Sequence, residues 1–294
     1  MIGRAAGNVY SYKINLHRRS EIVPLVGNVP TTVKSCPAAS VYNNTMFITG
    51  IGETINDIWK YNFTSGWNKC GCLVQGRECH CAEFIAEKLY ICGGSKGDIV
   101  TDSIEAYNAL TEESVTVGQL RLGSQRAACV AYKGSIYVYG GYDKNWQPLD
   151  TVQVFNPVDN TCTLLAIPMP RPCAGLRAVL WNTCAVLQTN ETCFICDFES
   201  KTFEEGKQFK TDAYPYLFGL VLNNERVFII DGSPLKTDGR VESRPESKSD
   251  VKYIRAASVF STKASQWKAF GQLPKSLSVI ATAKLSSAER INHD

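Results

Sequence analysis

Short runs of alternating apolar and polar residues recur along the chain, and polar turns separate them. Two runs, KLYICGG ending at Gly93-Gly94 and SIYVYGG ending at Gly140-Gly141, lie 47 residues apart. Alternation predicts a β-strand, because successive side chains of a strand point to opposite faces. A diglycine after such a run predicts a turn, since glycine adopts positive φ without a steric penalty. The pattern therefore predicts an all-β chain built from a repeated unit.

Weaker copies of this strand and turn are TMFITGIG at Gly50, NTCAVLQTN near Leu187 and RVFIIDG at Gly232. In all five units, the two strong ones and the three weak ones, another apolar strand precedes this strand and a third strand follows it. The third strands are marked by Tyr61, Tyr107, Phe155, Cys196 and Phe260. A polar turn and a fourth strand complete the unit, with Trp67, Ser114, Cys162, Phe203 and Trp267 at the matching position. Four strands in about 45 residues, repeated, are typical of a propeller blade.

The two ends of the chain supply a sixth unit. MIGRAAGNVYSYKI fits the second and third strands of a blade, and SLSVIATAKL fits a first strand that lacks its successors. We therefore expect a six-bladed β-propeller of four-stranded antiparallel blades, whose closing blade is shared between the N- and C-termini and removes two open sheet edges. The expected single domain, 1–294, divides into a closing blade at 1–29 plus 275–290 and blades at about 30–73, 74–122, 123–170, 171–211 and 212–274, the last with a polar insertion at 233–253.

The diglycine after an apolar strand, the later Tyr or Phe and the Trp beyond it resemble Kelch repeats, most strongly at 79–122 and 126–170. A closing blade with its innermost strand from the C-terminus is similar to the propellers of BTB-Kelch adaptors. In that family an N-terminal BTB region binds a cullin scaffold, and the propeller presents a substrate for ubiquitin transfer. The resemblance implies a substrate-recognition domain of a cullin-RING ubiquitin ligase adaptor, with the BTB part absent from this chain. The unit at 171–211 lacks the diglycine and the Trp, which predicts a short or distorted blade.

Composition narrows the classes of function. The 294 residues are 44% apolar and 20% charged, and a net charge of +3 is too small to indicate nucleic-acid binding. No apolar run is long enough to cross a bilayer, and the N-terminus lacks the features of a secretory signal. We therefore expect a cytosolic or nuclear protein whose twelve cysteines stay reduced.

One stretch, KCGCLVQGRECHCAEF at 69–84, concentrates Cys70, Cys72, Cys79, Cys81 and His80. In a strand Cys79 and Cys81 would point one way and His80 the other, so a single ion could not easily collect all five side chains. Small buried thiols packed between blades are the simplest interpretation. A zinc site and a redox-sensing thiol pair stay open, although the spacing is not a usual zinc motif. We predict no metal and no cofactor.

Catalytic residues are scarce. The three histidines, His17, His80 and His293, do not form a pattern that suits a hydrolase triad or a copper site. We therefore expect a protein-interaction module rather than an enzyme. Two alternatives remain: a Kelch scaffold that binds cytoskeletal or signalling proteins without a ligase, and a propeller enzyme with a metal or sugar site.

A partner is expected on the rim formed by the loops that join second to third strands and by the joints between blades, because loops held by a rigid scaffold carry recognition. The expected ligand is a protein or short linear peptide, with the cullin reached only indirectly and with neither nucleic acid nor membrane. A short peptide with acidic or hydroxyl groups would suit Arg77, Arg126 and Arg171, unless these arginines only bond neighbouring turns. Tyr142 and Trp146 are expected to be partly exposed or to pack back onto the rim. The predicted rim residues are Arg77, Lys96, Asp98, Gln125, Arg126, Tyr142, Asp143, Lys144, Asn145, Trp146, Arg171, Asn190, Tyr214 and Tyr216.

Overall fold

The structure is a computed structural model of the 294-residue chain. It describes residues 36–62, 64–189 and 192–205 with their side chains, and it describes further strands on both sides of these ranges by their backbone. Within the described residues the regular secondary structure consists of β-strands, as the alternating pattern predicts.

The described strands form four-stranded antiparallel sheets, which fit the blades of Kelch repeats. Three of the sheets follow one another between residues 38 and 164. Their strands are β4 (Ala38–Tyr42), β5 (Thr45–Ile51), β6 (Asp57–Asn62) and β7 (Gly66–Cys72); β8 (Cys81–Ile85), β9 (Lys88–Cys92), β12 (Ser103–Asn108) and β13 (Glu113–Gln119); and β14 (Ala128–Tyr132), β15 (Ser135–Tyr139), β16 (Val152–Asn156) and β17 (Thr161–Leu164). A small hairpin of β10 (Ser95–Lys96) and β11 (Ile99–Val100) leaves the second of these sheets.

Two more sheets follow in the same order of strands. They are formed by β18 (Arg177–Trp181), β19 (Cys184–Gln188), β20 (Cys193–Asp197) and β21 (Thr202–Glu205), and by β22 (Phe218–Asn223), β23 (Arg226–Pro234), β24 (Lys252–Ala257) and β25 (Trp267–Leu273). The predicted insertion at 233–253 overlaps the last two residues of β23 and the first two of β24, and its residues 235–251 lie outside the described part of the chain.

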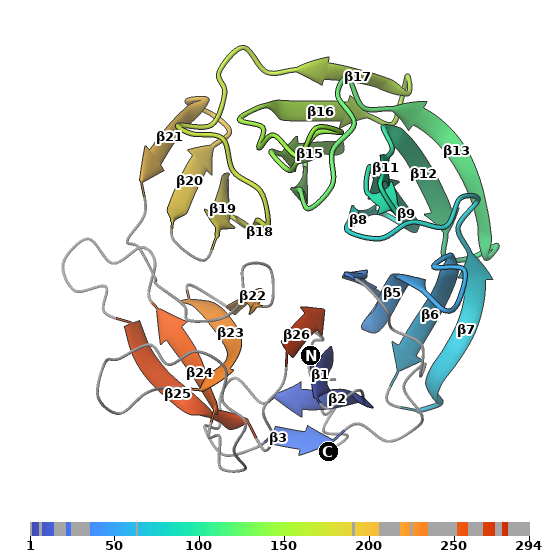
Figure 1. The fold of residues 1–294 in the computed structure, drawn as a ribbon, viewed down its shortest axis with the longest axis vertical. Coiled ribbons are helices and arrows are strands. Elements are labelled where there is room, and N and C mark those ends of the chain that lie inside the picture. The colour runs from blue at the N-terminus through green and yellow to red at the C-terminus, as the bar shows by residue number, and fades with distance from the viewer. Residues whose placement is uncertain are drawn as a thin grey trace, which may run out of the picture.

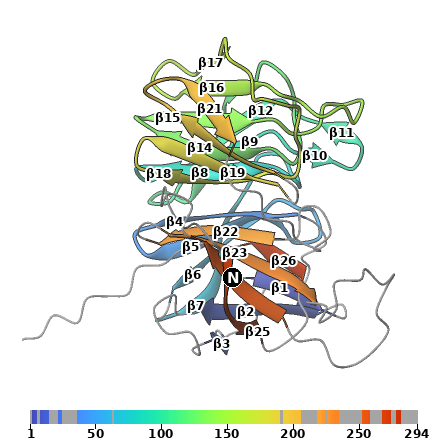
Figure 2. The ribbon, with the colours of Figure 1, turned by 90° about the vertical axis from the view of Figure 1, so that its left-hand side faces the viewer.

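The last sheet joins the two ends of the chain. β26 (Ser278–Ala281) pairs with β1 (Ile2–Ala5), which pairs with β2 (Asn8–Ile14) and then β3 (Ile22–Pro24). The first strands of the sheets contact one another in the order β4, β8, β14, β18, β22 and β26. Figure 1 shows the sheets set around a common axis, and Figure 2 shows the same arrangement from the side.

The second strand of a sheet is apolar on both faces because another sheet covers each face. In β9 Leu89, Tyr90, Ile91 and Cys92 are all buried. One side of this sheet packs against β15 and Phe155 of the next sheet, and the other side packs against Phe47 and Ile58 of the preceding one. The apolar core is therefore divided into layers between successive sheets.

The diglycines lie where one sheet meets the next. A Cβ atom on Gly93 would sit 2.3 Å from the carbonyl oxygen of Ser124, and one on Gly140 would sit 2.3 Å from that of Cys173. The following N–H groups, of Gly94 and Gly141, donate hydrogen bonds to these same oxygens at 2.8 and 2.9 Å. Glycine is needed at this turn because the neighbouring backbone occupies the side-chain position.

The unit at 171–211 forms a four-stranded sheet although it lacks the diglycine. Its three pairings run without a register shift, which corrects the expectation of a distorted blade. Thr189 stands in place of the first glycine, and its hydroxyl accepts a hydrogen bond from the N–H of Thr192 at 2.9 Å. A side-chain hydrogen bond thus supports the turn that glycine supports elsewhere.

Candidate partner-binding rim

The loop at 142–148 holds an exposed tryptophan in a fixed geometry. The Asp143 carboxylate accepts hydrogen bonds from the N–H groups of Asn145 and Gln147, both at 2.8 Å, and Asp143 exchanges backbone hydrogen bonds with Trp146 and Gln147. Trp146 has a φ of +58° and its side chain is 51% exposed. The bonded loop therefore presents the indole outward on a rigid support, as expected of a contact residue.

Two other predicted rim residues lie against this indole. The ring centroids of Tyr142 and Trp146 are 5.6 Å apart, and the guanidinium carbon of Arg126 lies 5.8 Å from the centroid of the Trp146 ring. A guanidinium over an aromatic face interacts with the negative face of the ring. The structure thus brings together Arg126, Tyr142 and Trp146, which we call the tryptophan cluster.

The β10–β11 hairpin stands beside the tryptophan cluster on the same rim. The Ser95 hydroxyl donates to the side-chain oxygen of Gln125 at 2.9 Å, and Gln125 exchanges two backbone hydrogen bonds with Tyr142. Gln125 itself is buried, so it connects the two loops instead of offering a surface. The exposed residues of the two loops are Lys96, Gly97, Asp98, Ile99, Lys144, Asn145, Trp146, Gln147 and Pro148.

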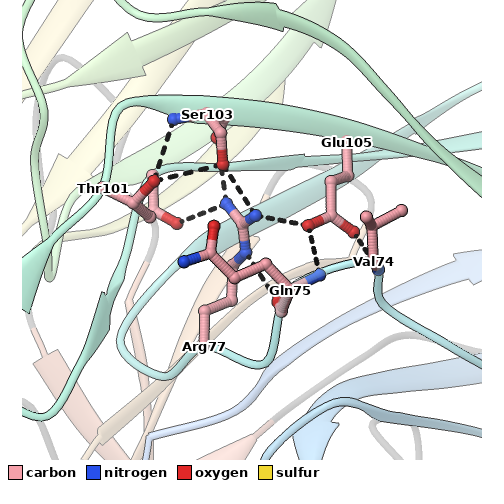
Figure 3. Close-up of polar contacts among 7 residues, drawn as sticks. Val74, Gln75, Arg77, Thr101, Ser103 and Glu105 are labelled. Carbon is pink, nitrogen blue, oxygen red and sulfur yellow. Dashed lines mark hydrogen bonds and ion pairs between the residues drawn. The ribbon is translucent and has the colours of Figure 1, made fainter.

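Arg77 does not reach the surface of the rim. Its side chain is 1% exposed and forms an ion pair with the equally buried Glu105. The guanidinium also donates to the carbonyl oxygens of Gly93 and Ser103 at 3.0 and 2.9 Å, and to the Ser103 hydroxyl at 2.7 Å (Figure 3). Arg77 is therefore a structural residue of the joint between two sheets, which corrects its place among the expected ligand-binding arginines.

Arg171 also lies apart from the tryptophan cluster. Its guanidinium carbon is 5.5 Å from the Phe194 ring centroid, and one nitrogen is 3.3 Å from the Glu205 carboxylate. The three arginines expected to share a ligand are thus found in three different settings. Three other predicted rim residues, Asn190, Tyr214 and Tyr216, lie outside the described residues.

A chain of backbone hydrogen bonds passes from sheet to sheet next to the axis. The N–H of Cys79 donates to Cys36 at 2.8 Å, that of Arg126 to Cys79 at 2.6 Å, and that of Gly175 to Arg126 at 2.8 Å. These four residues each stand two positions before the first strand of a sheet, and we call them the axial chain. Cys79, Arg126 and Gly175 have φ values of +55°, +57° and +69°.

Arg177 is a second cation near Arg126, and the sequence pattern did not single it out. Burial lowers the pKa of Arg177, and the nearby charge of Arg126 acts in the same direction. The sequence signal was weak, because Arg177 is the first residue of an innermost strand and reads there as one polar position in an apolar run. Arg126 and Arg177 together make this part of the rim cationic.

The cysteine-rich stretch at 69–84 is distributed among separate environments. Cys70 is buried and Cys72 is exposed, since a bulge in β7 shifts the alternation between them. Cys79 precedes β8 and contacts Cys36, whereas Cys81 begins β8 and lies next to Cys92 and Cys129. The expectation that Cys79 and Cys81 share a strand face is therefore corrected.

Metal centres and membrane spans are both missing from the described part of the chain. Among these residues, no group of three or more His, Cys, Asp or Glu side chains is arranged to hold a metal ion. The same residues contain no helix with the length and apolar character needed to cross a membrane.

Comparison with known protein families identifies the repeated unit. The family model of the Kelch motif matches residues 76–120 and 125–169, the two units with an intact diglycine. This chain carries Kelch repeats. It is also similar in sequence to Kelch-like proteins over most of its length.

The Kelch relatives are far in sequence. Human Kelch-like protein 23 is 21% identical over 246 residues, which cover 83% of this chain and 42% of that protein. Kelch-like protein 25 of Xenopus tropicalis is 24% identical over 170 residues, which cover 53% of this chain and 28% of that protein. This chain thus spans less than half the length of these curated relatives. A solved structure of YjhT, 15% identical, has a TM-score of 0.61 and a match that covers 70% of this chain and 74% of that one, a likeness of fold alone.

Proposed function

We propose first that the Kelch sheets form a closed six-bladed propeller. The support is the order of contacts among the first strands from β4 to β26, together with the pairing of β26 with β1. In this proposal the blades occupy the ranges expected from the sequence, and β26 and β4 meet where the ring closes. Closure removes the free sheet edges that a row of blades would leave.

We propose that this propeller is a non-catalytic protein-interaction module whose contact surface is the rim around the tryptophan cluster. The observation that carries the proposal is Trp146, a large aromatic side chain that is 51% exposed on a loop fixed by its own hydrogen bonds. Tryptophan, tyrosine and arginine dominate the energy of protein interfaces, and a fixed side chain loses little entropy on binding. Arg126 and Tyr142 supply the other two types beside it.

The charge on this rim favours an acidic ligand. Arg126 and Arg177 lie near the axis, and Lys96 and Lys144 extend from the adjacent loops. Guanidinium groups bind carboxylates through charge-assisted hydrogen bonds. A short linear peptide with a carboxylate for the arginines and an apolar side chain for Trp146 would match these groups.

The role we infer is substrate recognition for a cullin-RING ubiquitin ligase. This inference rests on the relationship to Kelch-like proteins and on the resemblance to BTB-Kelch adaptors. The cullin contact would belong to a BTB region that is not among residues 1–294. A fusion of this chain to a cullin-binding BTB region should ubiquitylate a partner that the rim binds, and a bound partner that stays unmodified would contradict the ligase role.

The binding proposal can be tested with a library of acidic peptides and the purified chain. Peptides selected by the native chain should bind Trp146→Ala at least about tenfold more weakly, because truncation of a central aromatic contact costs more than about 1.4 kcal/mol. Leu110→Ala is the matched control, since Leu110 is 70% exposed in a turn between third and fourth strands, away from the loops of the tryptophan cluster. Equal binding by all three proteins would place the contact surface elsewhere.

A further inference from the structure

Cys36 and Cys79 form a thiol pair between two neighbouring sheets. They occupy equivalent positions of the axial chain, before β4 and β8, and the Cys79 N–H donates to the Cys36 carbonyl oxygen at 2.8 Å. The two thiols also lie close enough to change each other's ionisation. Cys79 is buried and Cys36 is only half-buried, so one member of the pair can be reached from solvent.

The surroundings favour a thiolate on Cys36. The hydrogen bond from Cys79 and the nearby cations of Arg177 and Arg126 lower the pKa of Cys36 to about 6, against the opposing effects of burial and of Glu78. The hydrogen bond with Cys36 and burial raise the pKa of Cys79. One thiol of the pair therefore ionises readily while the other keeps its proton.

The other clustered cysteines lack this combination. Burial raises the pKa of Cys70, and contacts with other thiols, together with burial, raise the pKa values of Cys81 and Cys92. Cys81 and Cys92 are buried in the core between sheets, where a solvent-borne reagent has no access. Cys36 thus differs from Cys81 and Cys92 in its exposure and in lying near two cations, Arg126 and Arg177.

We propose that Cys36 and Cys79 are a redox-sensitive thiol pair, which a hydroperoxide converts to a disulfide that joins the first two described Kelch sheets at the axis. The Cys36 thiolate attacks one peroxide oxygen, the O–O bond breaks, and the departing oxygen takes a proton, leaving a sulfenic acid on Cys36. The Cys79 sulfur then attacks the Cys36 sulfur, the S–O bond breaks, and the hydroxyl leaves as water with the Cys79 proton. Two thiols are oxidised by two electrons, and one hydroperoxide is reduced to an alcohol, or to water in the case of hydrogen peroxide.

The geometry asks for little backbone movement. The Cys79 N–H already donates to the Cys36 carbonyl oxygen at 2.8 Å, so the two main chains lie side by side at the joint that a disulfide would cross. The disulfide would also remove the thiolate from beside Arg126 and Arg177. The oxidised rim would then present these two cations without a neighbouring negative charge.

The first test needs no substitution. Alkylation of the native chain by iodoacetamide can be followed at each cysteine by mass spectrometry. The alkylation rate of Cys36 should reach half its maximum near pH 6, against about pH 8.5 for a thiol without such neighbours. At pH 6.5 Cys36 should therefore be alkylated about fivefold faster than such a thiol, because its larger thiolate fraction is partly offset by the lower nucleophilicity of its thiolate. Exposed Cys72 supplies the reference rate. A half-maximal pH above 8 for Cys36 would overturn the proposal.

The second test looks for the bond itself. Hydrogen peroxide at a few equivalents should produce a peptide pair linked through Cys36 and Cys79, reversible by dithiothreitol. Cys36→Ser should lose the linkage, Cys72→Ser should keep it, and Arg177→Gln should slow its formation and raise the half-maximal pH. Oxidation of Cys36 without the linked pair, or a linkage that forms as fast in Arg177→Gln, would contradict the mechanism. Neither test depends on the proposed partner binding, so the two proposals can fail separately.

Discussion

His80 is a histidine held without charge in the contact between two sheets. It is buried, its Nε2 lies 2.7 Å from the Thr49 hydroxyl, and its Nδ1 has no hydrogen-bond partner among the described residues. Burial, reinforced by the charge of Arg77, lowers the pKa of His80 to about 3. The residue that first suggested a metal ligand is thus a neutral side chain of the core.

The buried state of His80 predicts acid sensitivity. The unfolded chain takes up a proton on this residue near pH 6.5, while the folded chain does so only near pH 3, so stability falls as the pH drops from 6.5 toward 3. Urea unfolding at successive pH values should show this loss, with a slope of at most about 1.4 kcal/mol per pH unit from this group.

Two variants isolate the contribution of His80. His80→Gln should flatten the slope below pH 6.5, whatever its effect on stability at pH 7.5. His17→Gln changes another histidine of the chain and should show the same slope of unfolding free energy against pH as the native protein. A slope that His80→Gln does not alter would mean that other groups cause the acid sensitivity.

The cysteine-rich stretch shows why single residues were hard to place from the sequence. Alternation correctly assigned Cys70 and Cys72 to the end of an outer strand and Cys81 to an inner one. It did not reveal the bulge at Cys70, although Gly71 follows it, or the positive φ of Cys79, which no glycine marks. The contact of Cys79 with Cys36 was equally hidden, since it joins two units and depends on how they pack.

The connectors between sheets are fixed by one side chain of the third strand. Glu105 of β12 accepts hydrogen bonds from the N–H groups of Val74 and Gln75 and pairs with Arg77. In the next sheet Gln153 of β16 takes the same place and bonds the N–H and carbonyl of Leu122, both at 2.9 Å. Ser124 stands where Arg77 stands. Equivalent connectors are thus held by an ion pair in one unit, through Glu105 and Arg77, and by a neutral amide in the next, through Gln153.

This comparison predicts a non-additive pair of substitutions. Glu105→Gln alone leaves the Arg77 cation buried without its carboxylate and should cost about 3–5 kcal/mol of unfolding free energy. The double variant Arg77→Ser with Glu105→Gln copies the neutral connector and should be more stable than that single variant by at least about 1 kcal/mol. Urea unfolding at pH 7.5 measures both, and a double variant less stable than Glu105→Gln would refute the exchange.

Much of the molecular architecture could be predicted from the sequence. Each unit needs four strands to hide its apolar faces, so the period, the strands and the turn glycines all follow from local pattern, and the structure contains them. The rim was harder to predict from the sequence. The sequence located the loop of Trp146, but it could not distinguish Arg77, which an ion partner buries, from Arg126, which lies against an exposed ring.

The pairing of β26 with β1 allows a test of the proposed closed propeller. A truncation after residue 277 removes β26 and exposes the edge of β1, whereas a truncation after residue 284 keeps β26. The shorter chain should unfold about 5 °C below the longer one if the lost pairing is worth about 3 kcal/mol, and its open edge should promote self-association. Calorimetry and light scattering measure these effects. Equal melting temperatures for the two truncations would argue against a closed propeller.

The axial chain has a bearing on how such a molecule diversifies. Main-chain atoms make the joint at positions 36, 79, 126 and 175, while the side chains there are cysteine, cysteine, arginine and glycine. Residues that tolerate a left-handed backbone could be exchanged at these sites with little loss of the joint. Specificity next to the axis can therefore evolve, or be engineered, separately from the scaffold that supports it.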